Sequence, residues 1–322
     1  MEKDLTKKRC LSDNERYADL INGFLFGGQQ MVQACDLQDM DSQSYGLKDW
    51  LLKKKNYYTQ RYRDIIKKAS FGVNFAVIGV ENQEEVHYLM PLRTMSYDAS
   101  EYERQAGVMR KKVRREKGIT RAEFLSGFRK TSRLYPCITL VLYFGEEWDG
   151  STDLHGLLDF SGVPEEMKQY VNNYPIHIFN IQHLEDTDVF RTDLKQIFDF
   201  IRYSKDKNML RKLVQDNPAY QEMDEDAFDM AVAYADSEEL ISVKKFYGKG
   251  GKVNMCKGLL DWMAEERQAG REEGREEGRE AARFELIVQM YNDGDIILSK
   301  ACARLGLTEE EFFEVKKRYE EK

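Results

Sequence analysis

Cysteine and histidine are scarce in this chain, and their arrangement excludes some kinds of chemistry. The five cysteines are scattered, with no CxxC pair, and the four histidines show no metal-ligand spacing with them. Zinc sites draw on closely spaced Cys and His ligands, so the sequence argues against a zinc site. An odd, dispersed set of cysteines is typical of a reducing compartment, and we therefore expect a cytoplasmic protein.

Long apolar runs are also missing. No run approaches the roughly 18 residues that a membrane-spanning helix needs, and the polar first residues lack the apolar segment of a signal peptide. We therefore expect no membrane partner. The hydrophobic content of 42% is sufficient for a core, while the charged content of 33% indicates long solvated helices as well.

Charge is distributed unevenly along the chain. The formal net charge is −8, which argues against a protein that binds nucleic acid over its whole surface. Residues 51–135, however, contain 19 Lys and Arg against 9 Asp and Glu. A phosphate backbone requires a positive field of this kind, although a solvated basic helix accounts for the Arg110–Lys117 cluster equally well.

Helical and strand patterns alternate over residues 1–205 and predict an α/β (α+β) domain. Ser12 and Glu15 have the spacing of a capping box, which predicts Ser12 as the N-cap of a helix that ends at a Gly27–Gly28 turn. Short apolar runs rich in β-branched residues predict strands over 62–67, 74–83, 134–144 and 176–181. A helical pattern extends from 90 to 115. This order predicts a mixed sheet flanked by helices.

Beyond residue 186 the patterns are helical only. We expect a helical extension over 206–253, one long charged helix over 254–292 with a Gly-Arg-Glu-Glu repeat, and a small helical unit over 293–322. The last unit resembles a helix-turn-helix, with a helix, a Gly turn at Gly306 and Thr308 as the N-cap of the next helix, but this second helix begins with three acids, Glu309–Glu311, which repel phosphate. We therefore expect the C-terminal helices to form a homodimer rather than to read DNA.

Two acids and an amide form the strongest functional pattern. The run 74–81 reads as a buried strand ending in Glu81, and side chains alternate across a strand, so Glu81 and Gln83 share one face. A buried acid is costly unless something pairs it. Asp64 lies one hairpin upstream. Two oxygen-rich groups on neighbouring strands predict a site for a hard divalent cation.

Other readings of these residues stay open. Asp64 can pair with Arg61 or Arg63 instead, which would leave Glu81 and Gln83 as ordinary polar groups at a strand end. Glu15 can approach the site from the first helix, although its capping role explains it. Two residues of the helix after the hairpin can contact the site or the substrate, or can lie on the helix surface: Tyr102 and Gln105.

An ordered set of motifs resembles the recombination-promoting nuclease (Rpn) family, also called YhgA-like putative transposases. The resemblance covers roughly residues 12–290 and rests on Asn14–Leu20, Arg61–Asp64, Val80–Gln83, Met90–Asp98, Ile138–Gly145 and Trp148–Gly150, with the Gly-Arg-Glu-Glu repeat behind them. It implies a restriction-endonuclease-like core of the PD-(D/E)XK type, with a mixed sheet of about four strands, and magnesium-dependent DNA cleavage linked to recombination.

The resemblance also implies roles for individual residues. Asp64 falls on the metal-binding aspartate, Glu81 on the second acid, Gln83 on the position usually held by lysine, and Glu15 near an acid sometimes supplied by the first helix. Mg²⁺ is the implied cofactor, with Mn²⁺ as a substitute. Residues expected to contact DNA are Arg61, Arg63, Arg93, Tyr102, Gln105, Arg110, Lys111, Lys112, Arg114 and Arg115.

Three functions are compatible with the sequence. The first is a metal-dependent DNA endonuclease that hydrolyses a phosphodiester with water as the nucleophile. The second is a non-catalytic DNA-binding or regulatory protein on the same scaffold, because Gln83 lacks the charge of the usual lysine and a cation there would stabilise the transition state. The third is an oligomeric scaffold in which the C-terminal helices are the functional part.

Overall fold

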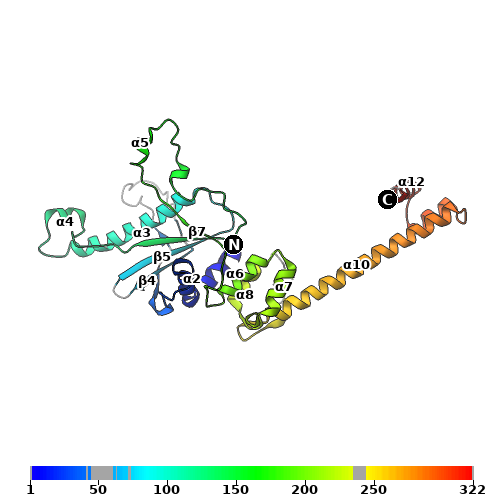
Figure 1. The fold of residues 1–322 in the computed structure, drawn as a ribbon, viewed down its shortest axis with the longest axis horizontal. Coiled ribbons are helices and arrows are strands. Elements are labelled where there is room, and N and C mark those ends of the chain that lie inside the picture. The colour runs from blue at the N-terminus through cyan, green and yellow to red at the C-terminus, as the bar shows by residue number, and fades with distance from the viewer. Residues whose placement is uncertain are drawn as a thin grey trace. The chain divides into compact units, whose positions relative to one another are not determined.

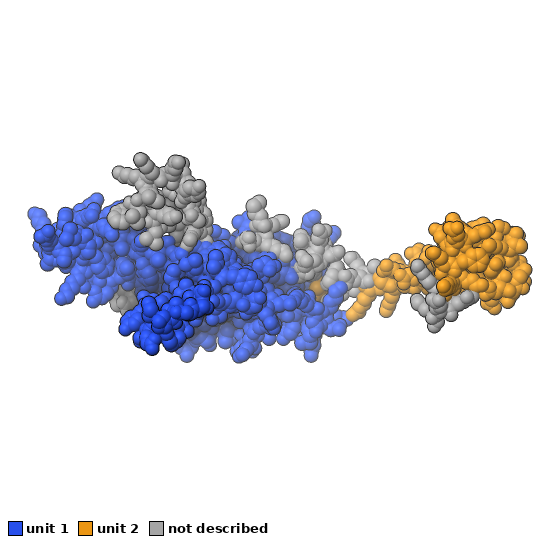
Figure 2. Space-filling view, turned by 90° about the horizontal axis from the view of Figure 1, so that it is seen from above, with its two compact units in different colours: residues 1–258 blue, residues 259–322 orange. Residues whose placement is uncertain are grey.

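The computed structural model describes residues 2–40, 43–44, 61–62, 64–71, 74–234 and 244–320. The chain divides into two compact units, residues 1–258 and residues 259–322 (Figure 2). Within the described residues, no helix has both the length and the hydropathy needed to cross a membrane. Arg63, which was predicted to contact DNA or to pair with Asp64, lies outside the described residues, as does most of segment 41–60.

A five-stranded mixed sheet forms the centre of the first unit (Figure 1). In the order β1-β4-β5-β6-β7, its strands are Leu37–Asp39, Ile65–Phe71, Asn74–Gln83, Cys137–Tyr143 and His177–Asn180. The first two pairings are antiparallel and the last two are parallel. The predicted α/β class and the predicted hairpin are therefore confirmed. A separate two-stranded ladder joins β2 (Gln43–Ser44) to β3 (Arg61–Tyr62).

Two helices cover opposite faces of this sheet. The amine of Lys67 on β4 lies 5.4 Å from the ring centroid of Tyr17 on α2 (Asn14–Phe26). The hydroxyl of Thr139 on β6 instead donates to Asp98 of α3 (Met90–Val113) at 2.8 Å. Lys67 opposes Ile78 and Thr139 opposes Gly79, so the two contacts fall on different faces. In Figure 1 the strands run between α2 and α3.

The start of α2 differs from the prediction in one respect. Asp13 is the N-cap, and its carboxylate accepts from the backbone N–H of Arg16 at 3.1 Å. The Ser12 hydroxyl donates instead to the carbonyl of Lys8, near the end of α1 (Glu2–Leu11). The end of α2 is as predicted, because Gly27 adopts the left-handed conformation that stops a helix.

The remaining elements of the first unit are mostly short. Its further α-helices are α4 (Arg121–Ser126), α5 (Glu165–Lys168), α6 (Leu194–Tyr203), α7 (Lys207–Asp216) and α8 (Glu225–Ala233). Single 3₁₀ turns lie at Ala34–Asp36, His155–Leu157, Ile181–His183 and Pro218–Gln221.

A small three-stranded sheet contradicts the expectation of helices only after residue 186. It joins β8 (Met223–Asp224), β10 (Lys252–Val253) and β9 (Gly248–Lys249). Strands of two residues are too short to leave an alternating pattern in the sequence, which explains why the expectation was wrong.

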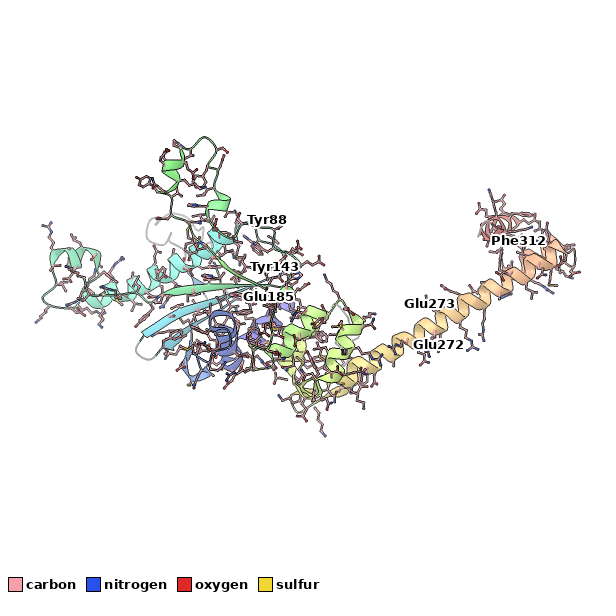
Figure 3. All side chains as sticks on the ribbon, in the orientation of Figure 1. Tyr88, Tyr143, Glu185, Glu272, Glu273 and Phe312 are labelled. Carbon is pink, nitrogen blue, oxygen red and sulfur yellow. The ribbon has the colours of Figure 1, made fainter. Side chains whose placement is uncertain are left out.

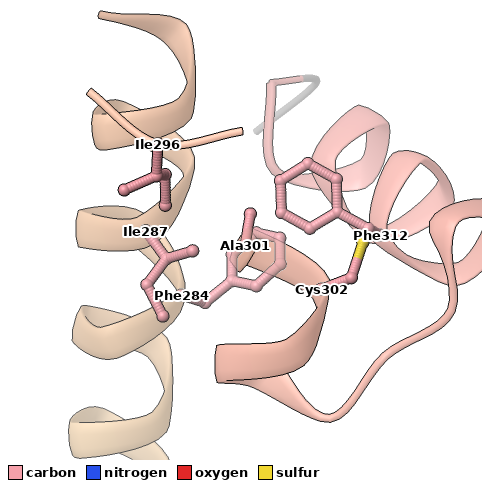
Figure 4. Packing of buried hydrophobic residues seen from close by; sticks show 6 residues of the cluster. All are labelled: Phe284, Ile287, Ile296, Ala301, Cys302 and Phe312. Carbon is pink, nitrogen blue, oxygen red and sulfur yellow. The ribbon is translucent and has the colours of Figure 1, made fainter. Parts of the chain in front are cut away.

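The C-terminal helices are α10 (Met255–Asn292), α11 (Leu298–Leu305) and α12 (Glu309–Glu320). The predicted long helix is confirmed, and the labelled Glu272 and Glu273 project from it in Figure 3. The second unit has a core of its own, built from Phe284, Ile287, Ile296, Ala301, Cys302 and Phe312 (Figure 4). Thr308 and Glu311 form the capping interaction that starts α12, so the predicted Thr cap is confirmed.

Candidate metal and nucleic-acid site

The β4–β5 hairpin brings Asp64 near Glu81. The antiparallel ladder ends where Ile65 opposes Val80, and Asp64 and Glu81 are the next residues outward from that pair. Residues directly opposite one another in such a ladder project to the same face. Both acids are an odd number of residues from the pair that faces α2, Lys67 and Ile78, so both belong to the α3 face.

Glu81 is buried among polar groups. Its side chain is only 1% exposed and forms an ion pair with Arg93 of α3. The hydroxyl of Tyr97 and the side-chain amide of Gln83 each donate to Glu81 Oε1 at 3.4 Å. The Arg93 ion pair also uses Oε1. A buried carboxylate needs such compensation, because transfer of an ion out of water is costly.

Asp64 lies close enough to act on the same groups. Its Oδ2 accepts from the backbone N–H of Asn82 at 2.7 Å, which holds the carboxylate beside the end of β5. Burial and then the charge of Glu81 raise the pKa of Tyr97 to about 12, and the charge of Asp64 adds to the shift. Burial lowers the pKa of Arg93, but Glu81, Tyr97 and Asp64 together raise it.

The donor set fits a magnesium-like ion better than a closed metal cage. Over the described part of the chain, no three His, Cys, Asp or Glu side chains are grouped as metal ligands. Mg²⁺ is commonly held by one or two carboxylates and takes its other ligands from water and phosphate. Asp64 and Glu81 meet that requirement, and Mn²⁺ accepts the same oxygen ligands.

Glu15 was predicted as a site residue, and the structure contradicts this. Its side chain is exposed near the start of α2. This helix packs on the face of the sheet that carries Lys67, whereas Asp64 and Glu81 belong to the other face. The sequence shows that Glu15 precedes the hairpin. It does not show which face of the sheet α2 covers.

Tyr102 and Gln105 attach α3 to the segment that leads into β6. The Tyr102 hydroxyl accepts from the backbone N–H of Cys137 at 3.0 Å. Gln105 is 6% exposed, and its amide oxygen accepts from the backbone N–H of Tyr135 at 2.8 Å. Burial of Gln105 excludes contact with a DNA backbone, so its expected DNA-binding role is wrong.

The predicted basic residues separate into groups. Arg93 is engaged by Glu81, the side chain of Arg61 is outside the described residues, and so is Arg63. Five exposed residues at the end of α3 form what we call the basic cluster: Arg110, Lys111, Lys112, Arg114 and Arg115. At 1.5 Å per residue the cluster begins about 26 Å along the helix from Arg93. Figure 1 shows this end of α3 leading into α4.

The two partners of Glu81 on α3 were not predicted as such from the sequence. Arg93 and Tyr97 are four residues apart and therefore lie on one face of α3, and Arg93 Nε donates to the Tyr97 hydroxyl at 2.6 Å. An Arg and a Tyr at this spacing, in a helix that follows an acid-tipped strand, was an available signal. Asp98 was also missed, and it accepts from Thr139 at 2.8 Å and from Tyr174.

Comparisons of the chain with protein-family models, with curated proteins and with solved structures find no match. The resemblance to recombination-promoting nucleases therefore stays a prediction.

Proposed function

We propose that this protein is a metal-dependent DNA endonuclease whose five-stranded sheet is a restriction-endonuclease-like core. The observation that carries the proposal is that Asp64 and Glu81 are the next residues outward from the Ile65–Val80 pair of the hairpin, and that the charges of both act on Arg93 of α3. Two carboxylates held by adjacent strands are the ligands that a hydrolytic magnesium or manganese site needs.

Each residue of the site has a defined task in this proposal. Asp64 and Glu81 hold the ion, which when bound would polarise the scissile phosphate and lower the pKa of the attacking water. Gln83 holds Glu81 by a hydrogen bond and its remaining amide groups orient water or a phosphate oxygen. The basic cluster at the end of α3 binds the phosphate backbone away from the reacting bond.

A homodimer is the expected assembly, formed through the helices after residue 254. Cleavage of both strands of a duplex takes two sites, which a dimer supplies. Val253, Met255 and Leu259 are fully buried, so a shortened chain should end after residue 264 to retain them. A shortened monomer that still nicks DNA would make the C-terminal helices accessory to cleavage, and loss of activity with the dimer would make assembly essential.

Nicking of supercoiled plasmid in Mg²⁺, in Mn²⁺ and in EDTA tests the proposal. Asp64→Ala removes the metal ligand and also the acceptor for the Asn82 N–H, so Asp64→Asn is the better variant because it retains an acceptor oxygen. We expect Asp64→Asn to lose nicking while its thermal melt stays close to that of the wild type. Nicking at the wild-type rate by Asp64→Asn would exclude this site.

A DNA-binding or regulatory protein without cleavage is the second candidate. It is favoured by the fact that Glu81 already has a cationic partner in Arg93, while the third residue of the motif, Gln83, carries no charge. This candidate predicts salt-sensitive retention of DNA and no nicking with either metal ion.

A further inference from the structure

The side chain of Arg93 contacts two residues of the site, Glu81 and Tyr97. One end of its guanidinium forms the ion pair with Glu81, and Nε donates to the Tyr97 hydroxyl at 2.6 Å. The guanidinium carbon also lies 5.6 Å from the centroid of the Tyr97 ring. Because Tyr97 also donates to Glu81 Oε1, these residues form a closed triangle of contacts.

Asp64 brings a second negative charge close to this triangle. Glu81 and Asp64 contribute two negative charges on one face of the sheet, and both act on Arg93. Arg93 supplies one positive charge, whereas a divalent cation would supply two. The guanidinium contacts the carboxylate of Glu81 that would hold the metal ion, so the two cations would compete for the charge of the same carboxylate.

Arg93 also has the means to leave this contact. Its side chain is 32% exposed, while that of Glu81 is 1% exposed, so the acid is fixed and the cation reaches solvent. An arginine side chain is long and has many rotamers. Its planar fork matches the oxygens of a phosphate in two-point contact.

We propose that Arg93 is an exchangeable counter-ion, which neutralises Glu81 until a divalent cation binds and then turns its guanidinium to the phosphate of the nucleic acid. This deepens the proposed nuclease function and rests on it for the second half of the exchange. In this scheme the positive charge absent from Gln83 is supplied by α3. Arg93 would then be in place for the developing charge of the transition state.

Arg104 provides a matched control on the same helix. It forms two hydrogen bonds of 2.7 and 2.8 Å with Glu101, whose side chain is 4% exposed. Like Arg93, Arg104 therefore neutralises a buried glutamate, which in this case belongs to α3 itself. It lies about 16 Å along the helix from Arg93, away from the pair formed by Asp64 and Glu81.

Calorimetric titration with Mn²⁺ alone tests the exchange without any assay of activity. Arg93→Gln removes the competing charge, so we expect Mn²⁺ to bind about tenfold more tightly than to the wild type, equal to about 1.4 kcal/mol. Arg104→Gln should leave Mn²⁺ affinity unchanged. Equal or weaker Mn²⁺ binding by a folded Arg93→Gln protein overturns the proposal.

The wild type provides a second readout, should Arg93→Gln fail to fold. The guanidinium Nε–H resonance of Arg93, assigned with Arg93→Lys, should shift when Mg²⁺ is added, and that of Arg104 should not. An unchanged Arg93 resonance in a protein saturated with Mg²⁺ contradicts exchange.

Failure of the two proposals can be told apart. Tighter Mn²⁺ binding by Arg93→Gln together with no nicking by the wild type would support the counter-ion and reject the nuclease. If the wild type nicks DNA and Arg93→Gln nicks it at the same rate, the phosphate contact of Arg93 is rejected. In the expected case Arg93→Gln binds Mn²⁺ more tightly and nicks at least 100-fold more slowly.

Discussion

The two faces of the central sheet each bury one charged side chain of the β4–β5 hairpin, and the two side chains have different partners. On the α2 face, Lys67 is 1% exposed and donates to three oxygens, at 2.7 Å to Ser12, 2.6 Å to Asn14 and 2.6 Å to Asp39. On the α3 face, Glu81 is equally buried, and the charge of a second acid, Asp64, also acts on its ion-pair partner Arg93.

The difference separates a structural charge from a functional one. An ammonium has three N–H donors, and each of those of Lys67 is used by the fold to join α2 and β1 to β4. Glu81 instead has a second carboxylate nearby, because the charges of both Glu81 and Asp64 act on Arg93. Two acids at one place are what a site for a divalent cation requires, whereas a fully coordinated amine stabilises the fold.

The largest expected effect comes from neutralising these two charges in turn. Lys67→Met removes three hydrogen bonds of a buried amine, so we expect a loss of about 3 kcal/mol in the free energy of unfolding and normal nicking by the folded fraction. Glu81→Gln keeps the shape and removes a buried charge, so stability should change by less than about 1 kcal/mol, while nicking falls at least 1000-fold. Urea unfolding and plasmid nicking measure the two quantities.

Lys68→Met is the control for the hairpin, because Lys68 is the next residue and its amine lies 4.8 Å from the ring centroid of Tyr135. Loss of one cation–π contact costs less than about 1 kcal/mol. If Lys67→Met were as stable as Lys68→Met, or if Glu81→Gln still nicked DNA, the contrast between the two faces would be lost.

A smaller effect is expected from the basic cluster. Exchange of Arg110, Lys111 and Lys112 for Gln should weaken DNA binding about tenfold and lower the slope of log affinity against log salt by about three, if each residue contacts one phosphate. Fluorescence anisotropy with a duplex at several salt concentrations measures both quantities.

The control triple variant exchanges Arg271, Arg275 and Arg279 of α10 for Gln. These three arginines are also exposed. Both variants exchange three positive side chains for neutral ones, so the change in net charge is the same. We expect this variant to bind DNA like the wild type. A similar loss in both variants would mean that overall charge, and not the basic cluster, determines affinity.

The smallest effect concerns Cys10, which is fully buried near the end of α1. Burial, opposed by the charge of Arg16, raises the pKa of the Cys10 thiol to about 12. The folded state therefore holds this proton more tightly than the unfolded state, so stability falls as pH rises from about 9 towards 12, by up to about 1.4 kcal/mol per pH unit. Unfolding of wild type and Cys10→Ala at pH 8 and pH 10 measures this difference.

The opposite sign, with the wild type gaining stability over Cys10→Ala as pH rises, would contradict the buried neutral thiol. The exposed Cys35 serves as the internal reference for reactivity, since thiol reagents should modify it well before Cys10 at neutral pH.

Local patterns predicted much of the fold. The alternation and β-branched content of 74–83 were sufficient for β5, and the Gly turn and Thr cap were sufficient to separate α11 from α12. The N-cap of α2 was displaced by one residue, because Ser12 and Asp13 are both good caps and only the path of α1 decides between them. The strands of the small sheet left no period to detect.

Of the candidate site, the sequence by itself determined that Asp64, Glu81 and Gln83 belong to one hairpin, and that Glu81 and Gln83 share a strand face. Alternation along a strand is a local property, so it can be read without a structure. Only the tertiary structure decided that α3 covers this face and α2 the other. That choice brings Arg93 to Glu81 and removes Glu15 from the site, because packing of helices on a sheet depends on contacts between residues distant in the chain.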